Sequence, residues 1–390
     1  MRSIGNVLDE AKGLGPGFDF LRVFLAFGVI FTHSFGIVGA RSVDDTPILW
    51  FNNYWILAMF FGLSGFLITG SALRLTLPNF LINRGLRIIP ALCVEIVFAA
   101  FVMGPLVTTL TLQAYLSDPQ TYHYLTNIVG WINYVLPGVF KDHPAPQVNL
   151  SLWTVPHELG CYAIMSAFIA FGLLKRPALV VLAAAVIMLG GIGLVAVGYA
   201  GKHHGFLQEF EYVVFYGPST RLYYSFLLGI ATYLYRHRLP YSWPLFGAMI
   251  VLSIGIALIP PGPWASYPVL NAVDGAPMAY IMAFLGATKL PRLPFFHTGD
   301  YSYGIYLYGF PVQQLAFNLM PASKSAVLNF LVSAMLVTGF AAFSWHCIEK
   351  QIMKLRKRFS FVARQRLAPE DPKEIAAGSS LSPGVVKPGS

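Results

Sequence analysis

The sequence predicts an all-α polytopic membrane protein with about ten transmembrane helices and both termini in the cytoplasm. Of its 390 residues, 56% are hydrophobic and only 11% are charged, and the mean hydropathy is +0.62. Ordinary soluble domains carry about 25% charged residues, so this composition excludes a soluble globular protein. The net charge of +9 does not indicate nucleic-acid binding, because the basic residues sit in short loops between apolar runs rather than in a patch on a soluble domain.

The apolar runs define the predicted spans, and the Lys and Arg residues between them orient the chain. Alternate connectors hold most of these basic residues, and the positive-inside rule places those connectors in the cytoplasm together with both termini. Residues 73–86 are expected to form a basic connector, and Pro90 is expected to lie in the first turn of the third span, where proline costs little. The predicted spans are residues 18–40, 50–71, about 90–108, 151–174, 177–199, 216–235, 244–259, 268–288, 301–320 and 326–348.

The predicted spans divide the chain into three parts. Residues 1–17 are expected to form a short polar cytoplasmic leader, residues 18–350 the membrane domain, and residues 351–390 a basic and then disordered cytoplasmic tail. The longest connector, residues 109–150, is too polar to span the bilayer. In the second span, the glycines and serine of FFGLSGFLITG are expected to permit close helix packing or a local break.

The cysteines indicate neither a disulfide framework nor a metal site. Cys93, Cys161 and Cys347 all lie in apolar runs and none belongs to a CxxC pair. Such residues usually behave as small buried hydrophobic side chains. We therefore expect no metal ligand among them.

The first span carries three ionisable residues in an otherwise apolar helix. Asp19, Arg22 and His33 lie within FDFLRVFLAFGVIFTHSFGIVGA. Because a charge at membrane depth costs at least about 2.5 kcal/mol, such residues usually face the bundle interior or a wet cavity. Arg22 and His33 share one helix face roughly 16 Å apart along the axis, and Asp19 lies at pairing distance from Arg22. The alternative is an ion pair at the helix end and a hydrogen-bonded core histidine.

A pair of arginines near the third span suits an anionic ligand. Arg84 and Arg87 in RGLRIIP are three residues apart, which places both guanidiniums on one helix face at the cytoplasmic surface. The planar fork of arginine matches phosphate geometry, so the pair could hold an anionic cytosolic ligand. The alternative is that the pair marks the inner leaflet and binds lipid headgroups.

The fourth and ninth spans begin with polar residues that could contact a substrate. In SLWTVPHE, Trp153 suits the aromatic belt, and Glu158 lies about one turn inside the span. The carboxylate of Glu158 could orient a sugar hydroxyl or a histidine, or it could serve as a capping or interhelical partner. Trp153 and Tyr303 are expected to contact the substrate, although tyrosines at a helix start are more often interface anchors.

Two further acidic residues could form structural pairs. Glu95 lies within the third span and could pair with an arginine. His346 and Glu349 are one turn apart at the inner end of the tenth span and are expected to pair with each other.

Five motifs occur in order along the chain, namely FDFLRVFLAFGVIFTH, FFGLSGFLI, RGLRIIP, SLWTVPHELGCY and SYGIYLYGFP. Together they resemble the acyltransferase-3 family of membrane acyltransferases, over roughly residues 17–350. The resemblance implies transfer of an acyl group, often acetyl from acetyl-CoA, to an extracytoplasmic carbohydrate such as lipopolysaccharide or exopolysaccharide.

The resemblance also implies roles for individual residues. The family's essential first-helix histidine and arginine fall on His33 and Arg22. The RxxR pair falls on Arg84 and Arg87, and the Trp–Glu motif falls on Trp153 and Glu158. This chain departs from the family at Gly309, where many members have histidine, and at Gln351, where proline often follows Glu-Lys. These departures bear on a second histidine and on the acceptor rather than on the chemistry.

These observations favour an O-acyltransferase of a bacterial inner membrane. Its catalytic residues would be His33, Glu158 and Asp19, its co-substrate would be acyl-CoA bound by Arg22, Arg84 and Arg87, and it would need no metal. Its partners would be a carbohydrate or glycolipid acceptor and membrane lipids.

The motifs do not decide between two chemical roles for His33, and they leave a second possible function for the protein. His33 would act as general base on the acceptor hydroxyl or carry the acyl group transiently. The rival is a secondary transporter that relays protons or ions through the same residues, although the chain has no inverted repeat. A scaffold protein is disfavoured because it would not need ionisable groups at membrane depth.

Overall fold

A computed structural model describes residues 2–11, 15–40, 47–198, 205–259, 267–291, 293, 296, 300–320 and 323–359. Within these ranges the chain is helical, and its β-structure is limited to one isolated antiparallel bridge between Ser3 and Pro240. The prediction of an all-α protein is therefore confirmed. Residues 360–390, which include the part of the tail predicted to be disordered, lie outside the described residues.

Every predicted span contains a helix, and five helical segments are long and apolar enough to cross a membrane. These five segments are residues 18–37, 55–72, 77–107, 177–196 and 326–354. The helices in the predicted spans are α2 (Phe18–Ile37), α3 (Pro47–Ala72), α4 (Leu77–Phe98), α8 (Val155–Ala170), α9 (Pro177–Ala196), α11 (Thr220–Leu234), α12 (Trp243–Ala257), α13 (Tyr267–Ala287), α14 (Ser302–Leu319) and α15 (Ala326–Ser344).

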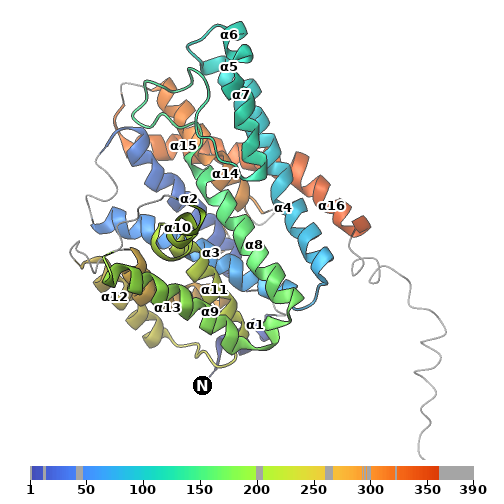
Figure 1. Cartoon of the computed structure of the whole chain (residues 1–390), viewed down its shortest axis with the longest axis vertical. Helices are drawn as coiled ribbons and strands as arrows, with labels where there is room; N and C mark the ends of the chain where they lie inside the picture. The colour runs from blue at the N-terminus through green and yellow to red at the C-terminus, as the bar shows by residue number, and fades with distance from the viewer. Residues whose placement is uncertain are drawn as a thin grey trace, which may run out of the picture.

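Shorter helices lie before, between and after these elements (Figure 1). The short α-helices are α1 (Ile4–Glu10), α5 (Gly104–Val107), α6 (Leu112–Ser117), α7 (Pro119–His123), α10 (Phe206–Glu211) and α16 (Lys350–Phe359). Helices of the 3₁₀ type are η3 (Tyr124–Val129), η4 (Leu150–Thr154) and η5 (Leu173–Lys175), and π-helices are η2 (Ala99–Met103), η6 (Tyr212–Tyr216) and η9 (Trp345–Glu349).

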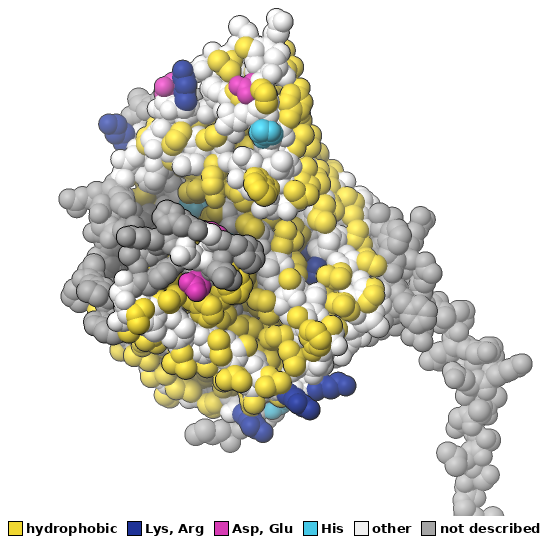
Figure 2. Space-filling view, viewed as in Figure 1, with side chains coloured by type: hydrophobic (Ala, Val, Ile, Leu, Met, Phe, Trp, Pro, Cys, Tyr) yellow, Lys and Arg dark blue, Asp and Glu magenta, His cyan; other side chains and the backbone are white. Residues whose placement is uncertain are grey.

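The outer faces of the long helices are apolar, as a lipid environment requires. On α15 the side chains of Leu331, Met335 and Phe343 are all more than half exposed, and Leu189 on α9 is equally exposed. Figure 2 shows hydrophobic side chains over most of one face, with Lys and Arg at its two ends. A soluble monomer rarely exposes so much apolar surface, so these faces are lipid-facing. The chain is a multi-pass membrane protein.

Helix α4 begins earlier than expected, and this changes the position of two arginines. The helix starts at Leu77 after Thr76, has Pro78 in its first turn, and continues through η2 and α5 to Val107. The prediction of a connector at 73–86 and of Pro90 in a first turn was therefore wrong. Pro90 lies inside the helix, which membrane helices tolerate because neighbouring groups satisfy the freed carbonyl.

The long connector at 109–150 is ordered by its own hydrogen bonds. Tyr115 is fully buried and donates to the carbonyl of Ala100 at 2.7 Å. The Gln314 amide of α14 donates to the carbonyl of Gln147 at 2.7 Å and binds the connector to the end of that helix. The connector covers the end of the bundle at which α6 and α7 lie (Figure 1).

The helices α3 and α11 pack backbone to backbone. A Cβ added at Gly229 of α11 would overlap the carbonyl of Gly62 in α3, and one added at Gly65 would overlap the carbonyl of Phe226. Close packing through small residues is how membrane helices gain van der Waals contact without a hydrophobic driving force. Of the two outcomes expected for FFGLSGFLITG, close packing is the one observed, and it fixes the position of the α3 wall described below.

We expect Gly229→Val to destabilise the fold by about 1–3 kcal/mol, because the branched side chain forces α3 and α11 apart. Gly339→Val on α15 is the matched control, since a Cβ at Gly339 has no neighbour within 4 Å. Thermal unfolding in detergent measures both. Equal melting temperatures for the two variants would contradict the close packing of α3 on α11.

Candidate functional site

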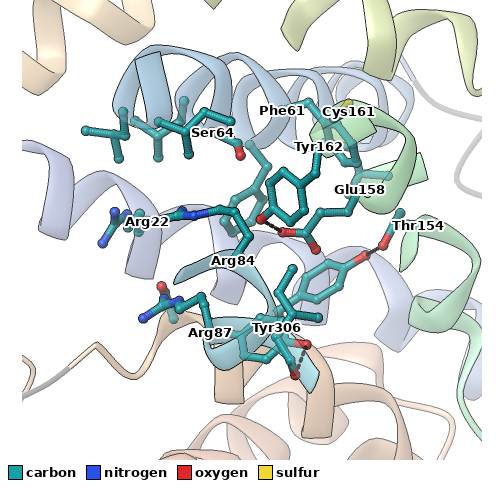
Figure 3. Close-up of a pocket in the computed structure, with 18 residues that line it drawn as sticks. Arg22, Phe61, Ser64, Arg84, Arg87, Thr154, Glu158, Cys161, Tyr162 and Tyr306 are labelled. Atoms are coloured by element: carbon teal, nitrogen blue, oxygen red, sulfur yellow. Dashed lines mark hydrogen bonds between the residues drawn. The ribbon is translucent and has the colours of Figure 1, made fainter. Parts of the chain in front are cut away.

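A cavity of about 250 Å³ lies between α2, α3, α4, α8 and α14. Its apolar wall comes mainly from α3, with Leu57, Phe61 and Leu67 among its side chains. Its charged side consists of three arginines, Arg22, Arg84 and Arg87. Figure 3 shows Arg22 and Arg87 on one side of the cavity, with Glu158 and Thr154 on the other.

The arginines of the cavity come from two helices and meet at one carboxylate. Arg22 Nη1 of α2 lies 3.0 Å from Oδ2 of Asp300, and Arg87 Nη2 of α4 lies 2.6 Å from the same oxygen. The Ser302 hydroxyl donates to the other carboxylate oxygen at 2.8 Å. Asp300 is a residue that the sequence analysis missed, although it stands two residues before the SYGIYLYGFP motif.

These contacts keep Asp300 ionised. Burial by itself would raise the pKa of its carboxyl, but Arg87 and Arg22 more than offset burial, so the pKa lies well below its usual range. A carboxyl group whose pKa is lower in the folded than in the unfolded protein stabilises the fold. This stabilisation is complete at any pH above the pKa of the unfolded chain, about 3.9, and is lost only in stronger acid. The Arg22–Asp300–Arg87 cluster therefore persists throughout the neutral range.

The expected pair between Asp19 and Arg22 is present but peripheral. Asp19 Oδ1 lies 3.7 Å from Arg22 Nη1, and the Asp19 side chain is 90% exposed. A pair this exposed contributes little. Asp19 does not line the cavity, so Asp300 is the partner that sets the position of Arg22.

Arg84 and Glu158 face each other across the cavity. The Arg84 guanidinium lies 6.0 Å from the centre of the Phe80 ring, and both arginines of α4 attract the Glu158 carboxylate. Glu158 also accepts a 2.6 Å hydrogen bond from the Tyr162 hydroxyl, one turn further along α8. The predicted motifs RGLRIIP and SLWTVPHE thus meet in one site.

A second set of hydrogen bonds holds the start of α8 against α14. The hydroxyls of Tyr306 and Thr154 are 2.6 Å apart, and both line the cavity. Asn149 caps η4 and donates to Glu95 Oε1 at 2.9 Å and to the carbonyl of Leu307 at 3.0 Å. Glu95 was expected to pair with an arginine, and that prediction was wrong: its partner is the neutral amide of Asn149.

The pair expected between His346 and Glu349 does not form in the described part of the chain. His346 Nε2 lies 2.9 Å from the Tyr301 hydroxyl, and Glu349 accepts from Ser344 at 3.0 Å. The π-helical turn η9 places these two side chains differently from the α-helical spacing on which the prediction rested.

His33 lies outside the cavity lining, further along α2. Its ring makes an edge contact with Phe310 of α14 at 5.1 Å between centroids. Its Nδ1 is buried and has no hydrogen-bond partner among the described residues, so the alternative of a hydrogen-bonded core histidine finds no support at this atom. Gln313 of α14 donates to the Ile30 carbonyl and to the Ser34 hydroxyl, both at 2.7 Å, and so binds α2 on either side of His33.

The two residues expected to contact substrate differ in position. Tyr303 lines the cavity and donates to the carbonyl of Ile88 at 3.3 Å. Trp153 is not among the lining residues, and its ring packs against His157 at 5.6 Å. The structure therefore brings together Arg22, Arg84, Arg87, Glu158 and Tyr303, but not His33, Asp19 or Trp153.

The cavity has the chemistry of a site for a long anion with an apolar part. Three guanidiniums suit phosphate oxygens, which they can bind through paired N–H groups. The apolar wall of α3 suits an uncharged chain, and the Glu158, Tyr162 and Thr154 side chains can hydrogen-bond a hydroxyl. Among the described residues, no group of three His, Cys, Asp or Glu side chains is placed to hold a metal ion.

Comparisons with known proteins find matches over most of the chain. A family model described as "Acyltransferase domain" matches residues 16–347. An O-acetyl transferase of Shigella phage Sf6 is 26% identical over 347 residues, which cover 86% of this chain and 95% of the phage protein. Nodulation protein 10 of Rhizobium leguminosarum is 29% identical over 387 residues, which cover 92% of this chain and 98% of that protein.

A third relative is longer than this chain. It is a Bacillus subtilis protein provisionally named as a peptidoglycan O-acetyltransferase, and it is 25% identical over 366 residues. The alignment covers 86% of this chain but only 54% of the relative. No solved structure matches the chain.

Proposed function

Because this chain belongs to the acyltransferase-3 family and is an acyltransferase of the membrane, we propose that it transfers an acyl group, acetyl foremost, from cytoplasmic acyl-CoA to a hydroxyl of an extracytoplasmic carbohydrate or glycolipid. The observation that carries this proposal is the cavity, in which three guanidiniums face an apolar wall and a carboxylate. Acyl-CoA combines phosphates with an uncharged arm, and this cavity offers a matching surface to each.

The proposed topology has ten spans, both termini in the cytoplasm and a location in the bacterial inner membrane. In it, residues 1–17 lead into a membrane domain of residues 18–350 and residues 351–390 form the tail. Contacts between segments support this topology. The Ile4 amide donates to the Leu239 carbonyl at 2.9 Å, so α1 lies beside the connector after α11, which the topology also places inside. Helix α16, after the tenth span, packs on α4 (Figure 1).

The donor would bind with its phosphates at Arg22, Arg84 and Arg87. Its pantetheine arm would follow the apolar wall of α3. An extended arm spans on the order of 15–20 Å, comparable to the roughly 16 Å rise from Arg22 to His33 along α2. The arm is therefore long enough to bring the thioester from the arginines to His33.

The proposed chemistry forms an ester and releases a thiol. The acceptor oxygen attacks the thioester carbonyl, the carbon–sulfur bond breaks, and CoA leaves as its thiol with the proton that the hydroxyl gave up. His33 would take that proton as general base or would carry the acyl group between two transfers. Glu158 would hold the acceptor sugar, with Tyr303 and Trp153 on the substrate path, and Asp19 would act only through Arg22.

The simplest test of the function uses purified protein and labelled acetyl-CoA. An acyltransferase hydrolyses the thioester slowly or transfers the label to an added glycan acceptor, whereas a proton- or ion-coupled transporter does neither. Mass spectrometry of surface glycans from a deletion strain and its parent would then identify the acceptor. Intact acetyl-CoA after incubation with folded protein and candidate acceptors would favour the transporter.

Arg84→Lys and Arg87→Lys should each weaken CoA binding by on the order of tenfold, because lysine keeps the charge but loses the paired N–H groups of the fork. The double variant Arg84→Ala/Arg87→Ala should weaken binding further. Calorimetric titration of detergent-solubilised protein with CoA measures these affinities. Arg74→Lys, at an exposed site before α4, is the matched control and should bind CoA as the parent does. Unchanged affinity in the double variant would sink this assignment.

His33→Ala should abolish acetyl transfer and leave CoA affinity within about twofold, because His33 lies outside the arginine cavity. Glu158→Gln keeps the size of the side chain but removes its charge, and should lower the transfer rate by about 100-fold if Glu158 holds the acceptor. His123→Ala, at an exposed site in the long connector, is the control. Transfer at the parental rate in folded Glu158→Gln protein would make this residue structural, and the same result for His33→Ala would remove the histidine from the mechanism.

A further inference from the structure

We propose that Asp300 is a positioning residue for the donor site: its carboxylate holds the guanidiniums of Arg22 and Arg87 in the orientation that places the thioester for reaction. This inference rests on the proposed function, since it assumes that the arginines bind the donor. It adds a residue from outside the recognised motifs, and it assigns that residue an effect on the chemical step rather than on donor affinity.

A single oxygen atom joins the two arginines. Asp300 Oδ2 lies 3.0 Å from Arg22 Nη1 and 2.6 Å from Arg87 Nη2, and these arginines belong to different helices, α2 and α4. Two guanidiniums this close together repel each other unless an anion lies between them. The Asp300 side chain is only 20% exposed, so water screens the repulsion poorly and the carboxylate is the group that permits the approach.

Asp300 acts on the cavity from behind its wall. Arg22, Arg87 and Ser302 line the cavity, whereas Asp300 does not. Asp300 engages Nη1 of Arg22 and Nη2 of Arg87. A guanidinium held on one edge presents its opposite edge in a fixed direction, which is what paired recognition of phosphate requires.

The Asp300 carboxylate is itself held in place, as it must be to orient two arginines. The Ser302 hydroxyl donates to Asp300 Oδ1 at 2.8 Å, and Ser302 begins α14. The cluster therefore ties α2 and α4 to the first turn of α14. The same helix carries Phe310, which contacts His33, so the donor site and the histidine are positioned by one rigid element.

Removing the charge has opposing effects on donor affinity. Without the carboxylate, the two arginine side chains must be ordered by the ligand, which weakens binding. The loss of a negative charge near the phosphates strengthens binding. The chemical step has no such compensation, because a thioester displaced by about 1 Å can lose on the order of 100-fold in rate. The predicted signature is a fall in kcat with little change in CoA affinity.

The test compares Asp300→Asn with the parent in two measurements. We expect kcat for acetyl transfer to fall by about tenfold or more and the Kd for CoA to change by less than about threefold. Asp142→Asn, at an exposed site in the long connector, is the matched control and should leave both unchanged. In an Arg87→Lys background, Asp300→Asn should have a smaller effect on kcat than in the parent, because the two residues act as one unit.

Two results would overturn the inference. The first is parental kcat in folded Asp300→Asn protein, whatever happens to CoA affinity. The second is a full additional loss of kcat when Asp300→Asn is made in the Arg87→Lys background. If Asp300→Asn does not fold, Ser302→Ala provides the test. It removes the hydrogen bond to Asp300 Oδ1 and should also lower kcat. Parental kcat in Ser302→Ala protein would contradict the positioning role of Asp300. Failure of the parent protein to bind CoA would instead contradict the proposed function.

Discussion

The arrangement of this protein depends on the cost of placing arginines inside a membrane domain. A guanidinium that is taken out of water loses its hydration, and two guanidiniums side by side also repel each other. Asp300 offsets both costs for Arg22 and Arg87 by accepting from each of them through one oxygen. Because the two arginines belong to α2 and α4 and the carboxylate directly precedes α14, three elements distant in sequence must converge at this point. The cavity is the space that their convergence leaves.

Helix α2 connects the charged cavity to the residue proposed to do the chemistry. Arg22 lies in the cavity wall, and His33 lies three turns further along, against Phe310. The amide of Gln313 holds α2 on either side of His33 through Ile30 and Ser34. On the opposite side of the cavity, the backbone contact of α3 with α11 sets the position of the apolar wall. The proposed sites of the donor phosphates and the acyl arm, and the histidine itself, are therefore held by rigid helices rather than by loops.

The sequence predicted a residue's position well where that position depends only on the helix that contains the residue. Hydrophobic runs predicted the helices. The motifs singled out Arg22, Arg84, Arg87 and Glu158 one by one, and the structure places all four around one cavity. The start of α4 was misplaced because both Pro78 and Pro90 suit a first turn, and only the packed structure shows which one occupies it. Asp300 could not be found from spacing, since its contact with Arg22 joins positions 278 residues apart. Glu95 was given the wrong partner for the same reason: an amide 54 residues away, rather than an arginine, reaches it in space.

The central claim is that one cavity carries an acyl group from a cytoplasmic donor to an acceptor on the other side of the membrane. Uniformly oriented vesicles test it most directly, with labelled acetyl-CoA present only on the side of the cytoplasmic connectors and acceptor glycan only on the opposite side. The account predicts labelled acetyl ester on the acceptor side, while acetyl-CoA itself stays where it was added. Product that forms only when donor and acceptor share one side, from protein shown to be active, would contradict it.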